Sequence, residues 1–265
     1  MEMSWLIALT GLGLIFGSFV NALVWRLHEG RDWVKERSEC NHCHHVLGPL
    51  DLIPVVSWIV LKGKCRYCHE KIEDSPWIEI SLAVLFVVSY IAWPIALHGV
   101  GLYQFAFWLV LLVGFMSLLV YDLRWMLLPD GVVFTLVGIA LMELVGQVIF
   151  YHFSISQVMS SLAGAIVLSG IFYLIFQVSK GEWIGGGDVK LAIVLGLLAG
   201  DPLRSTLLLF VASFLGLFAA LPQIVQKKGQ SLNLKIPFGP FLIGGLIVVQ
   251  LFGTPIINWY VGLFA

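Results

Sequence analysis

The chain has 265 residues, of which 59% are hydrophobic and only 12% are charged. Soluble domains carry about 25% charged residues, so this composition excludes a soluble globular protein and predicts one that crosses a membrane several times, in contact with lipid. The formal net charge of −1 gives no reason to expect nucleic acid as a partner.

Eight apolar segments are predicted to form helices, most of them close to the ~20 residues that a bilayer requires. The first segment is too long for the apolar region of a cleavable signal peptide and is interpreted as a membrane span. The sixth is too short to cross a bilayer alone. In chain order the segments cover 5–25, 78–97, 102–121, 131–150, 158–178, 189–199, 203–221 and 239–262.

The predicted fold is an all-α polytopic membrane protein of about eight transmembrane helices, with a small cytoplasmic loop domain between the first two. Its parts are a first transmembrane helix (1–25), the loop domain (26–77) and a membrane domain (78–265). Eight alternating crossings place every Lys and Arg except Arg204 on one side, which the positive-inside rule assigns to the cytoplasm. Outside the loop domain, those residues are Arg124, Lys180, Lys190, Lys227, Lys228 and Lys235.

Two Cys-x-x-Cys pairs lie in the predicted loop domain, Cys40 with Cys43 and Cys65 with Cys68. Two such pairs with 21 residues between them are typical of a closed four-thiolate site that binds structural Zn²⁺. The alternatives are redox pairs or free thiols, although a reducing cytoplasm disfavours stable disulfides. Nearby histidines could also act as substitute ligands: His42, His44, His45 and His69.

Two aspartates mark the boundaries of apolar segments on the predicted cytoplasmic side. Asp122 ends the third segment and Asp188 begins the sixth. Carboxylates at the edge of hydrocarbon are costly and are therefore functional candidates. A facing pair could hydrolyse a peptide, because one carboxylate takes a proton from water while the other donates to the scissile carbonyl oxygen. The alternative for Asp188 is a helix N-cap.

Three glycines, at 185–187, directly precede Asp188. Glycine permits positive φ and the close approach of another backbone, as a protease requires when it binds a peptide. Two further acids receive structural interpretations. Asp130 lies where the N-cap of the fourth segment belongs. Glu143 lies within that segment, too far from the aspartate pair to join it, and needs a buried partner or a proton.

Five motifs are distributed along nearly the whole chain. They are Gly17-Ser-Phe-Val-Asn21 with Arg26-Leu27, the Cys40–Cys68 loop, Pro76-Trp-Ile-Glu79, Tyr121-Asp122 with Leu128-Pro129-Asp130, and Gly185-Gly-Gly-Asp-Val-Lys-Leu191. Taken together, these motifs resemble those of type IV prepilin peptidases, a family of membrane aspartyl proteases with a Gly-x-Gly-Asp motif. The chain departs from the family at His28, where proline is usual, and at Gly186, where the family often has a bulkier residue.

The resemblance implies an enzyme with two activities in the bacterial cytoplasmic membrane. It would cleave the basic leader from type IV prepilins or pseudopilins after a glycine, on the cytoplasmic side. It would then N-methylate the new terminus with S-adenosylmethionine. Association with pilus or type II secretion machinery is a further expectation.

Roles for individual residues also follow from the resemblance. Asp122 and Asp188 would be catalytic. Gly63 and Lys64 would belong to the methyl-transfer half. Support for the substrate and the glycine loop would come from Gly185, Gly187 and Lys190.

Three alternatives differ in what the sequence should contain. A proton-coupled transporter could use the aspartate pair as a relay, but it predicts a repeat between the two halves, and the cysteine loop occurs once. A presenilin-like signal-peptide peptidase shares Tyr-Asp and Gly-x-Gly-Asp but has no reason to carry the cysteines. A methyltransferase or scaffold without protease activity would not need both aspartates.

Overall fold

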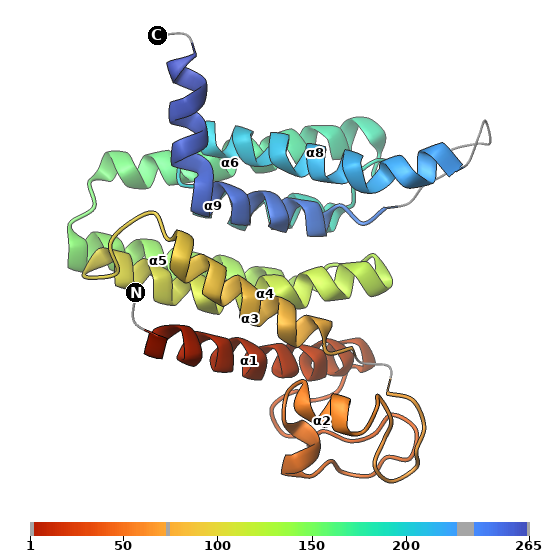
Figure 1. Ribbon diagram of the computed structural model, residues 1–265. Helices are drawn as coiled ribbons and strands as arrows, with labels where there is room; N and C mark the ends of the chain where they lie inside the picture. Colours follow the sequence, from red (N-terminus) through yellow and green to blue (C-terminus); the bar gives the residue numbers. More distant parts are fainter. Residues whose placement is uncertain (1–2, 73–74, 227–235, 264–265) are drawn as a thin grey trace. The chain divides into compact units, whose positions relative to one another are not determined.

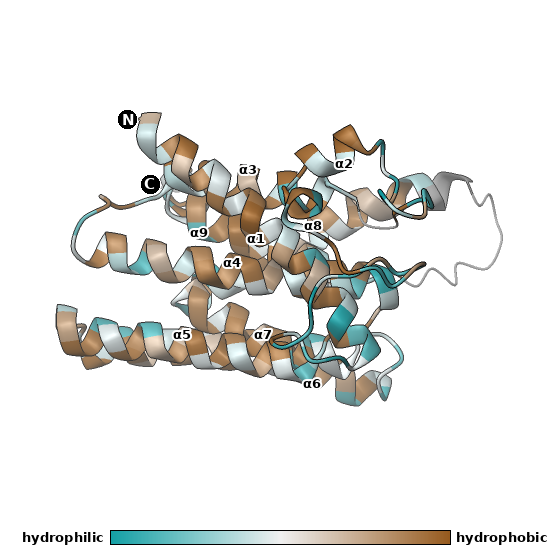
Figure 2. Cartoon of the chain, turned by 90° about the horizontal axis from the view of Figure 1, so that it is seen from below, coloured by the Kyte–Doolittle hydropathy of each residue, from teal (hydrophilic) through white to brown (hydrophobic). Residues whose placement is uncertain are grey.

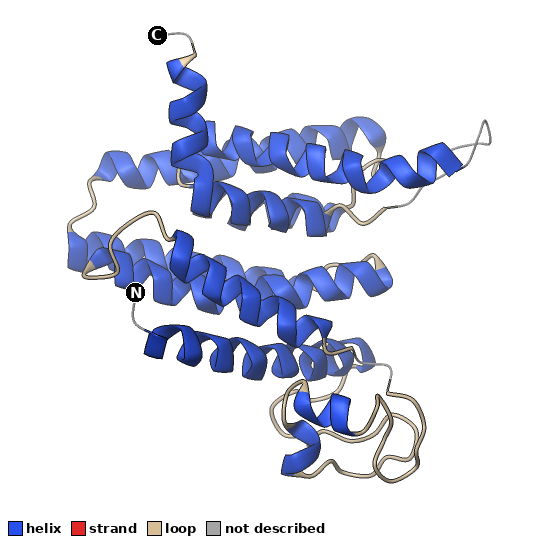
Figure 3. Ribbon diagram, viewed as in Figure 1, coloured by secondary structure: helices blue, strands red, loops and turns tan. Residues whose placement is uncertain are grey.

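The computed structural model describes residues 3–72, 75–226 and 236–263, so Lys227, Lys228 and Lys235 lie outside the described residues. Within the described ranges every long element is a helix and no strand occurs (Figure 3), which confirms the all-α prediction. A short 3-10 helix, η1, covers Pro49–Leu52. The α-helices are α1 (Met3–Glu29), α2 (Val56–Val60), α3 (Trp77–Ala92), α4 (Val100–Trp125), α5 (Asp130–Tyr151), α6 (Ile155–Ser179), α7 (Gly186–Ala199), α8 (Pro202–Gln226) and α9 (Gly239–Gly262).

Six of the described helices, α1, α4, α5, α6, α8 and α9, are long and apolar enough to cross a membrane. Their surfaces are apolar too: Val178, on α6, is 77% exposed. Figure 2 shows hydrophobic residues along the helices, whereas hydrophilic residues gather in the loops around α2. Apolar surface on this scale needs lipid to cover it, so the chain is a multi-pass membrane protein.

A helix forms at each of the eight predicted segments. Most of these helices extend a few residues beyond the predicted bounds, whereas α3 ends early and α7 begins early. The segment predicted at 78–97 ends at Ala92 in α3, which has only 16 residues. Pro94 follows almost at once, and proline disfavours helical backbone at the residue before it. By contrast, α7 begins at Gly186, three residues earlier than expected, so its first turn includes Asp188.

The chain forms two compact units, shown together in Figure 1. The first, called the loop unit here, comprises Met1–Ile91 with Leu112–Ser117. The second, called the aspartate unit, comprises Ala92–Leu111 with Leu118–Ala265. The functional division at residues 25 and 77 stays a prediction.

In the loop unit, α1 and α3 approach each other closely through two glycines of α1. A Cβ on Gly13 would overlap the backbone of Ala83, and one on Gly17 would overlap the backbone of Glu79. Small residues spaced by four positions are a usual device for close helix packing in membranes. They fix Glu79, at the start of α3, against the second half of α1.

In the aspartate unit, the short helix α7 is the central element. It packs against α5, α6, α8 and α9, and Leu191, Val194 and Leu195 have no exposed surface. Its contact with α6 depends on Gly164 and Gly196, because a Cβ on Gly196 would lie 2.6 Å from the Gly164 carbonyl oxygen. The longer helices around α7 therefore position its first turn.

Candidate functional site

Asp122 lies in the last turn of α4, and its side chain is buried, with only 5% of the residue exposed. Its Oδ2 atom accepts a hydrogen bond of 3.1 Å from the backbone amide of Gly239, the first residue of α9. A Cβ on Gly239 would lie only 2.5 Å from the same oxygen. A side chain at position 239 would therefore displace this carboxylate. Sequence reasoning missed Gly239, although its position before Pro240 is a helix-start signal.

Asp188 is the third residue of α7 and is half-buried. The N-cap position belongs to Gly185, and the Asp188 amide donates to the Gly185 carbonyl oxygen at 3.1 Å. The alternative interpretation of Asp188 as the N-cap is therefore wrong. A carboxylate in the first turn interacts favourably with the helix dipole. Asp188 also lies close enough to Asp122 for a direct electrostatic interaction between the two carboxyl groups.

Leu128, in the turn between α4 and α5, packs beside Gly187 and Gly239, the glycines that neighbour the two aspartates. A Cβ on Gly187 would lie 3.1 Å from the Leu128 Cβ, and one on Gly239 would lie 3.6 Å from the Leu128 Cδ2. The three glycines do not use the positive φ that glycine permits, since Gly185 has φ −73° and none of residues 185–187 has a positive φ. Gly187 instead makes room for Leu128 beside the first turn of α7.

Lys190 connects the start of α7 to the start of α5. Its Nζ atom lies 2.8 Å from both carboxylate oxygens of Asp130. Pro129 occupies the N-cap position of α5, so the interpretation of Asp130 as the N-cap is wrong. The pair lies on a partly exposed surface, where ion pairs are weak. Support of the glycine loop by Lys190 stays a prediction.

Glu143 has the buried partner that its position requires. The Gln147 side-chain amide, one turn further along α5, donates to Glu143 Oε1 at 2.9 Å, and Gln147 is only 6% exposed. This contact accounts for a polar side chain within a membrane helix without any role in catalysis.

The four cysteines converge in the loop unit. Their sulfur atoms all lie within 4.8 Å of one another, and the Cys40 and Cys68 sulfurs are 3.8 Å apart. Four sulfurs at the usual ~2.3 Å from a central Zn²⁺ in a tetrahedron would be about 3.8 Å from each other. The cluster can therefore hold a metal ion, and the residues present fit zinc.

Each cysteine pair lies in the same local backbone structure. In the first, the Cys40 amide donates to the His45 carbonyl and the His44 amide donates to the Cys40 carbonyl. The second repeats this pattern 25 residues later, with Cys65, Glu70 and His69 in the equivalent positions. His44 and His69 both adopt positive φ, at 56° and 61°. These two histidines therefore close the turns, and their side chains need not be ligands.

The thiols of the cluster differ in acidity. Burial raises the pKa of Cys40. Hydrogen bonds from the Cys43 and His42 amides and from neighbouring thiols lower it by more, so that the pKa is about 6. The Glu70 amide lowers the pKa of Cys68, whereas burial and hydrogen bonds to the other three thiols raise it to about 12. Cys40 is thus more readily deprotonated than Cys68, and metal binding requires deprotonated thiols.

Asp51 holds the two cysteine pairs together. Its side chain is almost fully buried and accepts a hydrogen bond of 2.6 Å from Arg66, and the Gly48 amide donates to its other oxygen. Burial raises the pKa of Asp51, but the hydrogen bonds from Arg66 and Gly48 lower it more, so that it stays below its ordinary value. This carboxylate remains charged wherever the loop is folded at neutral pH.

Gly63 and Lys64 have different surroundings. Gly63 has φ +69°, and a Cβ there would lie 3.0 Å from the indole of Trp58. Its conformation and its contact with the ring both require glycine. Lys64 is exposed and forms an isolated backbone bridge with Lys71.

The cysteine cluster and the aspartate pair lie in two regions that match known protein families. Residues 12–93 match the model of the bacterial peptidase A24 N-terminal domain, and residues 109–221 match that of the type IV leader peptidase family. The first match contains the cysteine cluster and the second contains both aspartates. No solved structure matches the chain significantly.

Three curated relatives resemble the chain over most of its length. A prepilin leader peptidase/N-methyltransferase of Burkholderia pseudomallei is 32% identical, over 92% of this chain and 84% of the relative. A type 4 prepilin-like proteins leader peptide-processing enzyme of Escherichia coli is 30% identical, over 90% and 91%. A prepilin leader peptidase/N-methyltransferase of Stutzerimonas stutzeri is 28% identical, over 94% and 91%. The chain therefore belongs to the type IV leader peptidase family.

Proposed function

We propose that this protein cleaves the leader peptide from prepilins or pseudopilins and N-methylates the new amino terminus. The observation that carries the proposal is the pair of carboxyl groups of Asp122 and Asp188, from helix ends 66 positions apart in the sequence, within electrostatic range of each other. The names of relatives that align over most of the chain supply the substrate class.

The two aspartates are the catalytic acid and base. At neutral pH a close pair of carboxyl groups can share one proton. The ionised member takes a proton from the attacking water, and the protonated member donates to the scissile carbonyl oxygen. The Gly239 amide holds the Asp122 side chain in one orientation through its hydrogen bond.

The substrate lies against the three glycines at the start of α7. Gly185 and Gly186 have room beside them, because a Cβ on either would meet nothing closer than 3.6 Å. Gly187 packs against Leu128, and Lys190 pairs with Asp130; these two contacts support the glycines. A peptide backbone could therefore approach Asp188 across the first two glycines.

The cysteine cluster binds structural Zn²⁺ through Cys40, Cys43, Cys65 and Cys68. The cysteine loop belongs to the methyl-transfer half, with Gly63 and Lys64 as its further candidates. S-adenosylmethionine would supply an electrophilic methyl group when bound. The neutral amine of the cleaved pilin accepts this methyl group and loses a proton, and the thioether S-adenosylhomocysteine is the leaving group. The cysteine loop and both aspartates face the cytoplasm of a bacterium, by the distribution of Lys and Arg. Association with pilus or type II secretion machinery belongs to the same proposal.

A cleavage assay tests the protease half. The substrate is a prepilin peptide with a basic leader, a Gly-Phe junction and the apolar helix, presented in liposomes, with products identified by mass. Asp122→Asn and Asp188→Asn should each lower the cleavage rate more than about 100-fold, since each removes one member of an acid–base pair. Glu143→Gln is the matched control, because it neutralises a buried acid outside the pair and should cleave normally.

Two results would contradict this assignment. Substantial cleavage by either Asp→Asn variant, with folding verified by an unchanged thermal transition, would remove that aspartate from the reaction. A failure of wild-type protein to cleave at the junction, across several leader sequences, would favour a methyltransferase or scaffold. A transporter and a presenilin-like peptidase are not favoured by the family match.

A further inference from the structure

The loop unit contains a cavity of about 190 Å³, called the loop cavity here. Three segments line it: the second half of α1, the cysteine loop and the first turn of α3. Apolar, aromatic and charged side chains all contribute to its surface. Those that carry the argument are Asn21, Trp25, Trp58, Glu79 and Arg26.

Close packing of α1 on α3 brings Asn21 and Glu79 to the same cavity. Gly17 admits the α3 backbone at Glu79, and Asn21 follows Gly17 by one helical turn. The Val55 amide donates a hydrogen bond to the Glu79 carboxylate, which ties the cysteine loop to the same place. The motifs at residues 17–21 and 76–79 therefore both contribute side chains to one wall of this cavity.

Asn21 leaves a hydrogen-bonding group available in this wall. Only 7% of the residue is exposed, and its side-chain oxygen has no hydrogen-bond partner among the described residues. A buried acceptor without a donor is unusual in a folded protein and indicates a missing partner. A ligand that brings an N–H donor into the cavity would satisfy it.

Trp58, from the cysteine loop, contributes an aromatic side chain to the lining of the cavity. Its indole packs directly on Gly63, where a side chain would collide with the ring. Gly63 therefore positions a ring that lines the cavity, even though Gly63 itself does not line it. Aromatic faces attract cations and stack on planar ligands.

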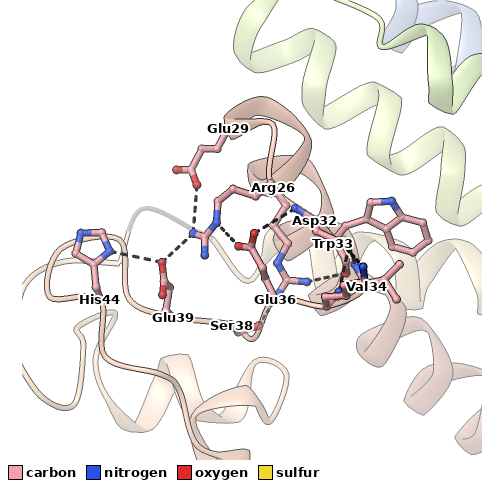
Figure 4. A network of polar contacts seen from close by, with 11 residues as sticks. Arg26, Glu29, Asp32, Trp33, Val34, Glu36, Ser38, Glu39 and His44 are labelled. Atoms are coloured by element: carbon pink, nitrogen blue, oxygen red, sulfur yellow. Dashed lines mark hydrogen bonds and ion pairs between the residues drawn. The ribbon is translucent and has the colours of Figure 1, made fainter.

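Charged side chains of both signs, called the rim here, also line the cavity. Figure 4 shows Glu29, Glu36 and Glu39 converging on one guanidinium group, that of Arg31, while Arg26 donates to the Trp33 carbonyl and Ser38 hydroxyl oxygens. Except for Trp33 and Glu36, these residues also line the cavity. Such a rim suits a ligand that carries both an ammonium and a carboxylate group.

We infer that the loop cavity binds the methyl donor, S-adenosylmethionine; this inference rests on the proposed methyl-transfer activity. The donor combines a planar base with N–H donors, a sulfonium cation and an amino-acid group, which match the amide oxygen, the aromatic and acidic wall, and the charged rim. The enclosed volume is below the ~300 Å³ of typical ligand pockets, so the cavity encloses one end of the donor and the rim covers the other.

Binding of S-adenosylhomocysteine, the demethylated product, to the purified full-length protein tests this inference by calorimetry. Asn21→Leu and Trp58→Leu should each raise the Kd at least tenfold while keeping normal metal content and normal cleavage. Trp77→Leu, a tryptophan change in the same unit but outside the cavity, and Asp188→Asn should bind like wild type. Unchanged Kd values in both cavity variants would overturn the inference.

Photocrosslinking of radiolabelled S-adenosylmethionine to wild-type protein gives a second measurement that depends on no variant. Label on peptides containing residues 18–25, 57–66 or 75–79 is expected, and label confined to the aspartate unit would overturn the inference. Cleavage is assayed on the same preparation. If wild-type protein cleaves but binds no S-adenosylhomocysteine, the donor site is overturned and the protease assignment is not affected. If Asp188→Asn cleaves, the protease assignment is overturned and the donor site is not affected.

Discussion

The cysteine loop and the helix α7 are held in place by opposite means. In the loop, at residues 26–77, only Gly63 and Cys65 are buried among the described residues, and the contacts are the cysteine cluster, Asp51 with Arg66, and short backbone turns. Half of the residues of α7 are buried against neighbouring helices, so its position depends on apolar packing. A region with so little core needs a metal or cross-links to fold, whereas a packed helix does not. The two regions should therefore respond differently to the same treatments.

Removal of a metal ligand should produce the largest contrast. Cys40→Ser should lose bound zinc almost completely, beyond the ~10–100-fold loss of affinity that outer-shell changes cause. The loop should unfold, and methylation should fall much more than cleavage. Metal content by mass spectrometry and both activities on one preparation check this.

His42→Ser is the matched control for that change, since His42 is exposed and lies between two of the cysteines. It should keep its zinc. Loss of zinc in this variant would replace the four-cysteine set by one that includes histidine. Equal loss of cleavage and methylation in Cys40→Ser would show that the loop also shapes the protease site.

Gly239→Ala tests the packed region. The added Cβ would lie 2.5 Å from Asp122 Oδ2, so the carboxylate must move. A displacement of about 1 Å at a catalytic group can cost about 100-fold in rate, and a loss of 10- to 100-fold in cleavage is expected. Zinc content and donor binding should not change.

Gly138→Ala is the control for this substitution, because nothing among the described residues lies within 4 Å of the added Cβ. It should cleave normally and, by helix propensity, be slightly more stable. Normal cleavage by Gly239→Ala would mean that the Gly239 amide does not orient Asp122.

The smallest effect is expected at the ion pair between Lys190 and Asp130. Both groups are partly exposed, and such pairs contribute no more than about 1 kcal/mol. Lys190→Met and Asp130→Asn should each lower cleavage less than about fivefold, to the same extent. A much larger loss in Lys190→Met alone, measured with the prepilin peptide, would assign Lys190 a direct contact with the substrate.

The parts of this architecture that depend on local sequence could be predicted, and those that depend on distant contacts could not. The eight helical segments follow from apolar runs, and the cysteine cluster follows from the spacing of Cys40, Cys43, Cys65 and Cys68. By contrast, the hydrogen bond from Gly239 to Asp122 joins residues 117 positions apart, and no local pattern indicates it. Asp130 and Asp188 resembled N-caps because N-caps are usual at helix starts, yet Pro129 and Gly185 occupy those positions.

The length of α7 has a consequence for the supply of water. Its 14 residues extend for about 21 Å, some 9 Å less than the ~30 Å hydrocarbon core of a bilayer. Hydrolysis consumes water, which is scarce among lipid chains. Non-helical backbone cannot stay dry in hydrocarbon, so the missing length must be hydrated or lined by polar groups. The glycine loop that precedes Asp188 lies at one end of this deficit, where a hydrated recess would deliver the second reactant to the carboxylates.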